Sequence, residues 1–209
     1  MTVGDLLFLL TVLIFLGSVF FVLYALLKHQ VHLARNVSLI ALLWIAGYLI
    51  AVLGVSLFTP QAVLRPHQEH CFDDMCFSVV SAVTRKTLGS PPSQFTTQGD
   101  YYLITVQLRN AGRGRAQKPS STSFVLVDEQ GNNYEVVSKA EGSIGQNPAW
   151  DRQLPAGTTA TKVYVFDVPQ TAKIRGLIVS EGGGGFPLVL VLGDENSWLH
   201  QKTLMLLPS

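Results

Sequence analysis

The sequence of 209 residues predicts an all-β antiparallel sandwich of about seven to eight strands, preceded by an α-helical transmembrane hairpin. Two uncharged apolar runs, Leu6–Leu27 and Val37–Phe58, lie near the N-terminus. After Thr59, hydrophobic residues recur at every second position between turn-rich stretches, which is typical of strands. The predicted organisation is a hairpin over residues 1–58, a connector over 59–75 and a sandwich over 76–209.

Each apolar run is long enough to cross a bilayer. A helix of about 22 residues rises about 33 Å, which matches a hydrocarbon core of about 30 Å. A cleaved signal peptide is the alternative for the first run, and it normally has a basic start and small residues at its end. This run begins beside Asp5 and ends at Lys28 and His29. The sequence therefore favours a retained span.

The loop between the runs, residues 28–36, sets the predicted orientation. It carries Lys28 and Arg35, whereas residues 1–5 carry no basic side chain and the next cation after the second run is Arg65. Short loops that contain Lys and Arg stay in the cytoplasm. We therefore expect this loop inside the cell, with both termini and the C-terminal domain on the extracytoplasmic side.

Small side chains within the two runs offer surfaces for close helix packing. They include Gly17, Ser18, Gly47, Ala51 and Gly54. The expected partners are the lipid bilayer and a protein, either in the membrane or outside the cytoplasm.

The connector, residues 59–75, contains Pro60 and Pro66 and shows no sustained period, so a short stiff segment is expected. Beyond it, turn residues separate short segments of alternating or continuous apolar character. The predicted strands are Cys76–Thr84, Tyr101–Asn110, Phe124–Val127, Tyr134–Val137, Thr161–Val168, Ile174–Ser180, Leu188–Leu192 and Thr203–Leu207. Trp198 and Leu199 are expected to plug one end of the sandwich.

The two cysteines, Cys71 and Cys76, lie shortly after the second apolar run. A lone close pair in an oxidising compartment usually forms a disulfide, which agrees with an extracytoplasmic domain. A metal site made of His67, His70, Cys71 and Cys76 is an alternative, although this spacing matches no standard zinc motif. A redox pair is a further alternative, but thiol oxidoreductases favour two intervening residues and this pair has four.

Three stretches resemble a known family: YYLITVQLRNAG (Tyr101–Gly112), FVLVDEQGNNYE (Phe124–Glu135) and LPAGTTATKVYVFDVP (Leu154–Pro169). In this order they resemble the telokin-like, immunoglobulin-fold domains of unknown function that occur on secreted and membrane-anchored bacterial proteins. The resemblance implies an immunoglobulin-like sandwich and an extracytoplasmic setting, here at the bacterial inner membrane. It carries no catalytic residues to this chain.

The residues favour binding over catalysis. His200 has Asp194 and Ser197 nearby in sequence, but no nucleophile motif accompanies them, so no enzyme activity and no cofactor are expected. Basic and acidic residues are equal in number after Thr59, which disfavours nucleic-acid binding. The predicted function is a membrane-anchored extracytoplasmic module that binds a protein or an envelope ligand. A redox or metal-handling protein and an accessory subunit of a membrane complex are the alternatives.

Overall fold

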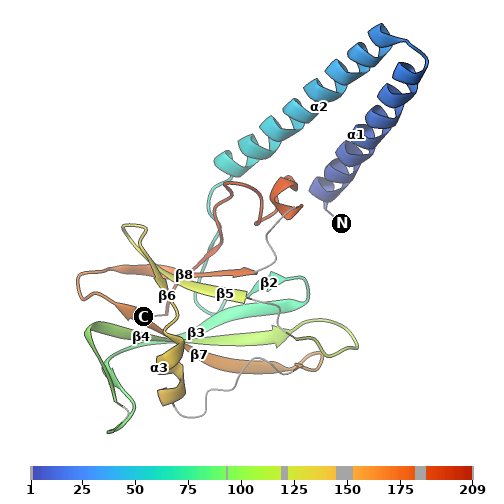
Figure 1. Ribbon diagram of the computed structural model, residues 1–209. Coiled ribbons are helices and arrows are strands. Elements are labelled where there is room, and N and C mark those ends of the chain that lie inside the picture. Colours follow the sequence, from blue (N-terminus) through green and yellow to red (C-terminus); the bar gives the residue numbers. More distant parts are fainter. Residues whose placement is uncertain (1, 93, 119–121, 145–152, 182–186, 209) are drawn as a thin grey trace. The chain divides into compact units, whose positions relative to one another are not determined.

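Figure 1 shows the computed structural model of the chain, which describes residues 2–92, 94–118, 122–144, 153–181 and 187–208. The chain forms two compact units, one made of residues 1–60 and 184–201, the other of residues 61–183 and 202–209. The first unit contains two long helices and the second contains a β-sandwich. The predicted fold class is therefore confirmed.

The helices α1 (Val3–Leu27) and α2 (Val31–Phe58) are both long and apolar enough to cross a membrane. Very little of either apolar stretch is buried within the protein. Helix α2 begins before Val37, where the apolar run starts, because the polar residues upstream continue its hydrogen bonding, as in the bond from Ala34 N to Gln30 O. Arg35 therefore lies outside the apolar run but inside helix α2.

The glycines of the hairpin do not bring α1 and α2 together. A Cβ atom built on Gly17, Gly47 or Gly54 would meet no described atom within 4 Å. The buried residues of the two helices instead include the alanines Ala25, Ala34 and Ala41. The Trp44 indole donates a hydrogen bond of 3.4 Å to the Thr11 hydroxyl. The prediction that these glycines allow close packing of α1 against α2 is therefore wrong. Their surfaces remain open.

The predicted strand Leu188–Leu192 is wrong. Its first three residues form a 3-10 turn, η2 (Leu188–Leu190), which belongs to the helical unit. Leu190 N donates to Pro187 O at 3.0 Å, and the Tyr48 hydroxyl of α2 donates to Leu190 O at 2.7 Å. The physical reason is that a short continuous apolar run marks burial or lipid contact without distinguishing a strand from other structure.

The expected position of Trp198 and Leu199 is also wrong. Both residues belong to the helical unit rather than to the sandwich. Their exposed fractions are 58% for Trp198 and 55% for Leu199, so neither side chain plugs a core.

The sandwich consists of two sheets (Figure 1). The first has the strand order β1-β9-β8-β5-β6 and the second has the order β2-β3-β4-β7. The strands are β1 (Val63–Leu64), β2 (His70–Phe72), β3 (Met75–Leu88), β4 (Phe95–Asn110), β5 (Thr122–Asp128), β6 (Asn133–Glu135), β7 (Thr159–Val168), β8 (Ile174–Glu181) and β9 (Leu204–Met205). A short helix, α3 (Ser138–Glu141), and a 3-10 turn, η1 (Gly142–Ile144), follow β6.

The segment expected to be a plain connector, residues 59–75, contributes two strands. β1 pairs in parallel with β9, with Val63 opposite Leu204, while β2 pairs antiparallel with β3. All other described strand pairs are also antiparallel. β1 and β2 have only two and three residues and lie in a stretch without a sustained period, so the prediction missed them.

Side chains from both sheets meet in one core. Its fully buried members include Phe77 of β3, Ile104 of β4, Leu126 of β5, Phe166 of β7 and Leu177 of β8. Members of this core recur at every second position, as Tyr164, Phe166 and Val168 do on β7. Some positions between them are buried too, because Leu103 and Val165 belong to a second buried cluster. The core thus follows the period-two pattern that the sequence shows.

Gly99 fixes one end of the sandwich. A Cβ atom at this position would lie 2.0 Å from the backbone oxygen of Val168, so only glycine permits this approach of β4 to β7. The contact brings Thr96–Gly99 beside the turn after β7, where Ala172 N donates to Pro169 O. These two segments line a polar hollow at this end of the sandwich.

The turn between β5 and β6 is organised by the buried carboxylate of Asp128. Its oxygens accept hydrogen bonds from Gln130 N, from Asn132 N and Nδ2, and from the Tyr134 hydroxyl. Burial acts to raise the pKa of Asp128, but the hydrogen bonds from Asn132, Tyr134 and Gln130 outweigh it and hold the pKa below its ordinary value. The turn therefore depends on an ionised Asp128.

We expect Asp128→Asn to lower stability at neutral pH and to weaken the dependence of stability on pH. A carboxyl group with a lowered folded-state pKa stabilises the protein above its unfolded pKa of about 3.9, and this stabilisation is lost as the pH falls through the folded value. Urea midpoints of the detergent-solubilised chain at neutral pH and at about pH 3 measure the difference. If the wild type and Asp128→Asn lost the same amount of stability on acidification, the role of Asp128 would be contradicted.

Candidate functional site

The structure joins the two cysteines in a disulfide between adjacent strands. Cys71 of β2 lies opposite Cys76 of β3, and the two sulfur atoms are bonded. Among the described residues, Glu69 rather than His67 or His70 lies within 4.8 Å of both sulfur atoms. Because the disulfide uses both sulfurs, neither is a thiolate ligand for a metal in this state.

An ion pair accompanies the disulfide. Arg109 of β4 donates to Glu69 through Nε, at 2.7 Å, and through Nη2, and its Nη2 lies 4.0 Å from the Cys76 sulfur. The Arg109 guanidinium holds the pKa of Glu69 below its usual range. In turn, Glu69 neutralises the cation that would otherwise stabilise a Cys76 thiolate. The arrangement fits a structural disulfide better than a redox pair.

Replacing both cysteines, Cys71→Ser with Cys76→Ser, is expected to cost about 2 kcal/mol of unfolding free energy, because the disulfide closes only a small ring. Urea unfolding of the purified chain followed by pulse proteolysis measures the loss. The reduced wild-type protein serves as the control and should match the variant. A variant as stable as the oxidised wild type would show that the disulfide contributes nothing to the fold.

A side groove opens between β5 and β7, where β6 ends and α3 begins. Lys162 Nζ lies 3.1 Å from a Glu141 carboxylate oxygen and 4.7 Å from the centre of the Tyr164 ring. Phe124 stacks on Tyr164 with ring centres 4.1 Å apart. Burial, with a smaller effect of Glu141, raises the pKa of Tyr164 well above its ordinary value. The phenol therefore stays protonated and does not act as a base.

An end hollow lies where Gly99 brings β4 against the end of β7. Thr97 Oγ1 donates to Asp167 Oδ1 at 2.5 Å, and Gln170 Nε2 donates to Gln98 O at 3.2 Å. The described residues that line the hollow include no Lys, Arg or His. They are Thr96, Thr97, Gln98, Gly99, Tyr134, Asp167, Pro169, Gln170 and Thr171. Hydroxyl and amide groups suit a ligand that is itself rich in hydrogen-bonding groups.

The sequence prediction did not find this hollow. Thr97 and Asp167 are 70 positions apart, and each is unremarkable within its own strand. One signal was present, because Gly99 interrupts an otherwise polar strand start, and an isolated glycine in a strand marks close backbone approach.

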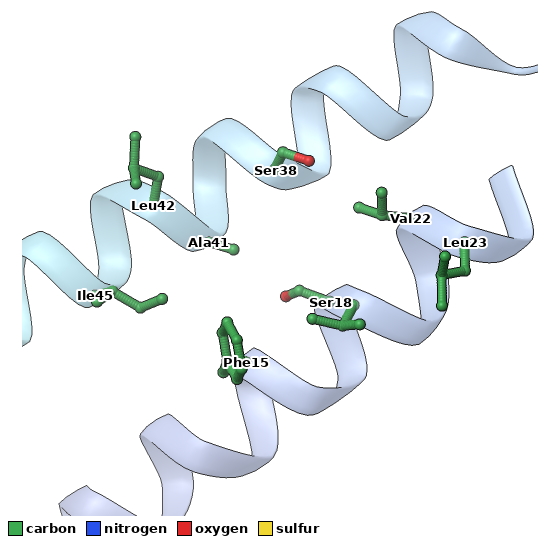
Figure 2. A pocket seen from close by; sticks show the side chains of 9 residues that line it. Phe15, Ser18, Val22, Leu23, Ser38, Ala41, Leu42 and Ile45 are labelled. Carbon is green, nitrogen blue, oxygen red and sulfur yellow. The ribbon is translucent and has the colours of Figure 1, made fainter. Parts of the chain in front are cut away.

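The helical unit has a groove of its own between α1 and α2, with a volume of about 280 Å³. Figure 2 shows its lining side chains, which come from both helices and are mostly apolar. The hydroxyl of Ser18 donates to Ile14 O at 2.7 Å within its own helix. The groove therefore offers a mostly apolar surface, in which Ser18 and Ser38 are the polar side chains among the described lining residues.

No curated protein matches the sequence. Solved structures do match it. A conserved hypothetical protein from Bacillus anthracis shares 19% identity, with 56% of this chain and 88% of that chain covered and a TM-score of 0.43. The secreted protein MPT63 from Mycobacterium tuberculosis shares 16% identity, with coverage of 60% and 93% and a TM-score of 0.41. An uncharacterised β-sandwich protein from Clostridium difficile shares 11% identity, with coverage of 72% and 96% and a TM-score of 0.42.

A family model described as a domain of unknown function, DUF4352, matches residues 68–184. The match covers more than half of the chain and most of the sandwich. It confirms the part of the sequence resemblance that concerned a β-sandwich domain of unknown function. The chain belongs to the DUF4352 family.

Proposed function

We propose that this protein is a membrane-anchored, non-enzymatic module that holds its DUF4352 sandwich outside the cytoplasm and binds a protein or an envelope ligand there. The observation that carries the proposal is the combination of two long lipid-compatible helices with a disulfide-bonded β domain in one chain. Disulfides persist in oxidising compartments. The basic residues Lys28 and Arg35 near the helix–helix loop support a cytoplasmic position for that loop.

Topology is tested with two single additional cysteines, Thr171→Cys in the sandwich and His29→Cys in the helix–helix loop. Both side chains are exposed, and the native cysteines are already bonded to each other. We expect a membrane-impermeant maleimide to label Thr171→Cys in intact cells, and to label His29→Cys only after lysis. Labelling in the opposite order would place the sandwich in the cytoplasm and overturn the proposal.

The end hollow is the surface on which we expect ligand binding. A photo-crosslinking amino acid at Thr171, on the rim of the hollow, is compared with the same group at Thr161, which is exposed on β7 away from the hollow. The expected result is a crosslinked product in cells from position 171 that is absent from position 161. Asp167→Asn, which changes the hollow, is expected to reduce it. No product from position 171 across several growth conditions would contradict binding at the hollow.

An accessory role in a membrane complex is favoured by one observation, the open glycine surfaces of α2. Gly47→Leu with Gly54→Leu would add side-chain volume to these surfaces, where the first added atom, Cβ, meets no described neighbour within 4 Å. If the hairpin docks in a complex, proteins that co-purify in mild detergent should be lost from this variant. Unchanged co-purification would leave the hairpin as an anchor only.

A further inference from the structure

Residues 187–201, which lie between β8 and β9 in the sequence, fold with the helices rather than within the sandwich. The segment turns back on itself, because Trp198 N donates to Val189 O at 2.9 Å and the Ser197 hydroxyl donates to Val191 O. Gly193, with a φ of +76°, allows the reversal. We call residues 187–201 the returning loop.

Specific contacts fix the returning loop on the hairpin. Gly4, in the first turn of α1, approaches so closely that a Cβ atom there would lie 2.1 Å from Leu192 O. Leu192 also lines a mostly apolar pocket with Leu7 of α1 and Trp44 of α2. Tyr48 of α2 donates its hydroxyl proton to Leu190 O. The loop therefore packs where α1 begins, at the end opposite the helix–helix loop.

On α1 this position coincides with an edge of the predicted membrane span, whereas on α2 the contacted residues Trp44 and Tyr48 lie within the predicted span. The apolar run of α1 starts at Leu6, directly after the contact at Gly4. The returning loop exposes Trp198 and Leu199, two large apolar side chains, at 58% and 55%. Trp is enriched where the hydrocarbon core meets the headgroups, because its ring is apolar and its N–H is polar.

We infer that the returning loop is a third membrane contact, with Trp198 and Leu199 inserted into the interfacial region of the extracytoplasmic leaflet. The inference rests on the proposed membrane anchor. The loop is continuous in space with the lipid-facing surface of the hairpin, so lipid is the occupant that the exposed side chains meet.

The chain connections give this contact a structural consequence. The polypeptide passes between the two units after residue 60, after residue 183 and after residue 201. The second and third connections exist only because the returning loop leaves the sandwich between β8 and β9. A membrane-bound loop would therefore restrain the sandwich through three chain segments instead of one.

Three variants with one tryptophan each test the inference in the full chain, reconstituted in lipid nanodiscs. The sequence has three tryptophans, Trp44, Trp150 and Trp198. One variant keeps Trp198, a second keeps Trp44 inside α2, and the third replaces all three by Phe and adds Thr171→Trp as an aqueous control. Lipids brominated on the upper part of the acyl chain quench nearby indoles, and iodide quenches those in water.

We expect brominated lipid to reduce the emission of Trp198 and of Trp44 roughly twofold or more, and iodide to quench only Thr171→Trp, because membrane-embedded indoles are shielded from water. Quenching of Trp44 by lipid and of Trp198 by iodide alone would overturn the inference and leave the anchor in place. If neither agent quenched Trp198, protein rather than lipid would cover this side chain, and the inference would also be overturned. A Trp44 that lipid does not quench would refute the anchor itself.

A second probe at the neighbouring position tests whether the quenching depends on the side chain at residue 198 alone. Trp198→Phe with Leu199→Trp, in the same background without Trp44 and Trp150, moves the indole by one residue on the same exposed surface. The same quenching pattern is expected, and iodide quenching alone would again overturn the inference.

Discussion

Replacing Phe166 by alanine is expected to lower the unfolding free energy of the sandwich by about 3–5 kcal/mol, the largest effect of any single substitution considered. Phe166 is fully buried near the C-terminal end of β7 and lies opposite Tyr102 of β4. It belongs to the core that both sheets share. Removing its ring deletes buried apolar surface and leaves a cavity that the paired strands cannot collapse to fill.

Urea unfolding of the detergent-solubilised chain, followed by pulse proteolysis, measures this loss. The matched control is Val83→Ala on β3, where the side chain is 48% exposed, so that the loss should stay below about 1 kcal/mol. A Phe166→Ala variant no less stable than the Val83→Ala variant would show that the two sheets do not pack around Phe166.

The long strands could be predicted because their side chains alternate. The predicted strand Thr161–Val168 falls within β7 (Thr159–Val168). The predicted strand Ile174–Ser180 covers all of β8 (Ile174–Glu181) except its last residue. In both, one face is buried in the core, so burial imposes a period of two on the sequence. The strand predicted at Leu188–Leu192 was wrong because this segment is apolar without alternation and packs on the helices.

The candidate sites could be predicted only where their residues are close in sequence. The disulfide followed from two cysteines with a short spacing and from the expected compartment. The ion pair of Glu69 and Arg109 spans 40 positions, and the bond from Thr97 to Asp167 spans 70. Such pairs depend on strand register, which one sequence does not reveal. The end hollow therefore became visible only in the folded chain.

Replacing Asn110 by alanine is expected to cost about 3 kcal/mol of unfolding free energy, because it removes three hydrogen bonds made by a fully buried side chain, each worth about 1 kcal/mol. Asn110 ends β4 and is fully buried. Its Nδ2 donates to Arg115 O at 3.2 Å and to Leu154 O at 2.8 Å, while its Oδ1 accepts from Gly112 N at 2.9 Å. One side chain thus holds the turn after β4 against the segment that leads into β7.

The urea midpoint of Asn110→Ala, compared with that of Asn133→Ala at an exposed position of β6, separates this role from a general effect of losing an asparagine. Asn110→Asp refines the result. It keeps the acceptor for Gly112 N but turns a carboxylate oxygen towards the two carbonyl oxygens, so it should be at least as destabilising as alanine. If Asn110→Ala unfolds at the same urea concentration as Asn133→Ala, the buried amide does not hold these segments together, and the sandwich closes here through its strands alone.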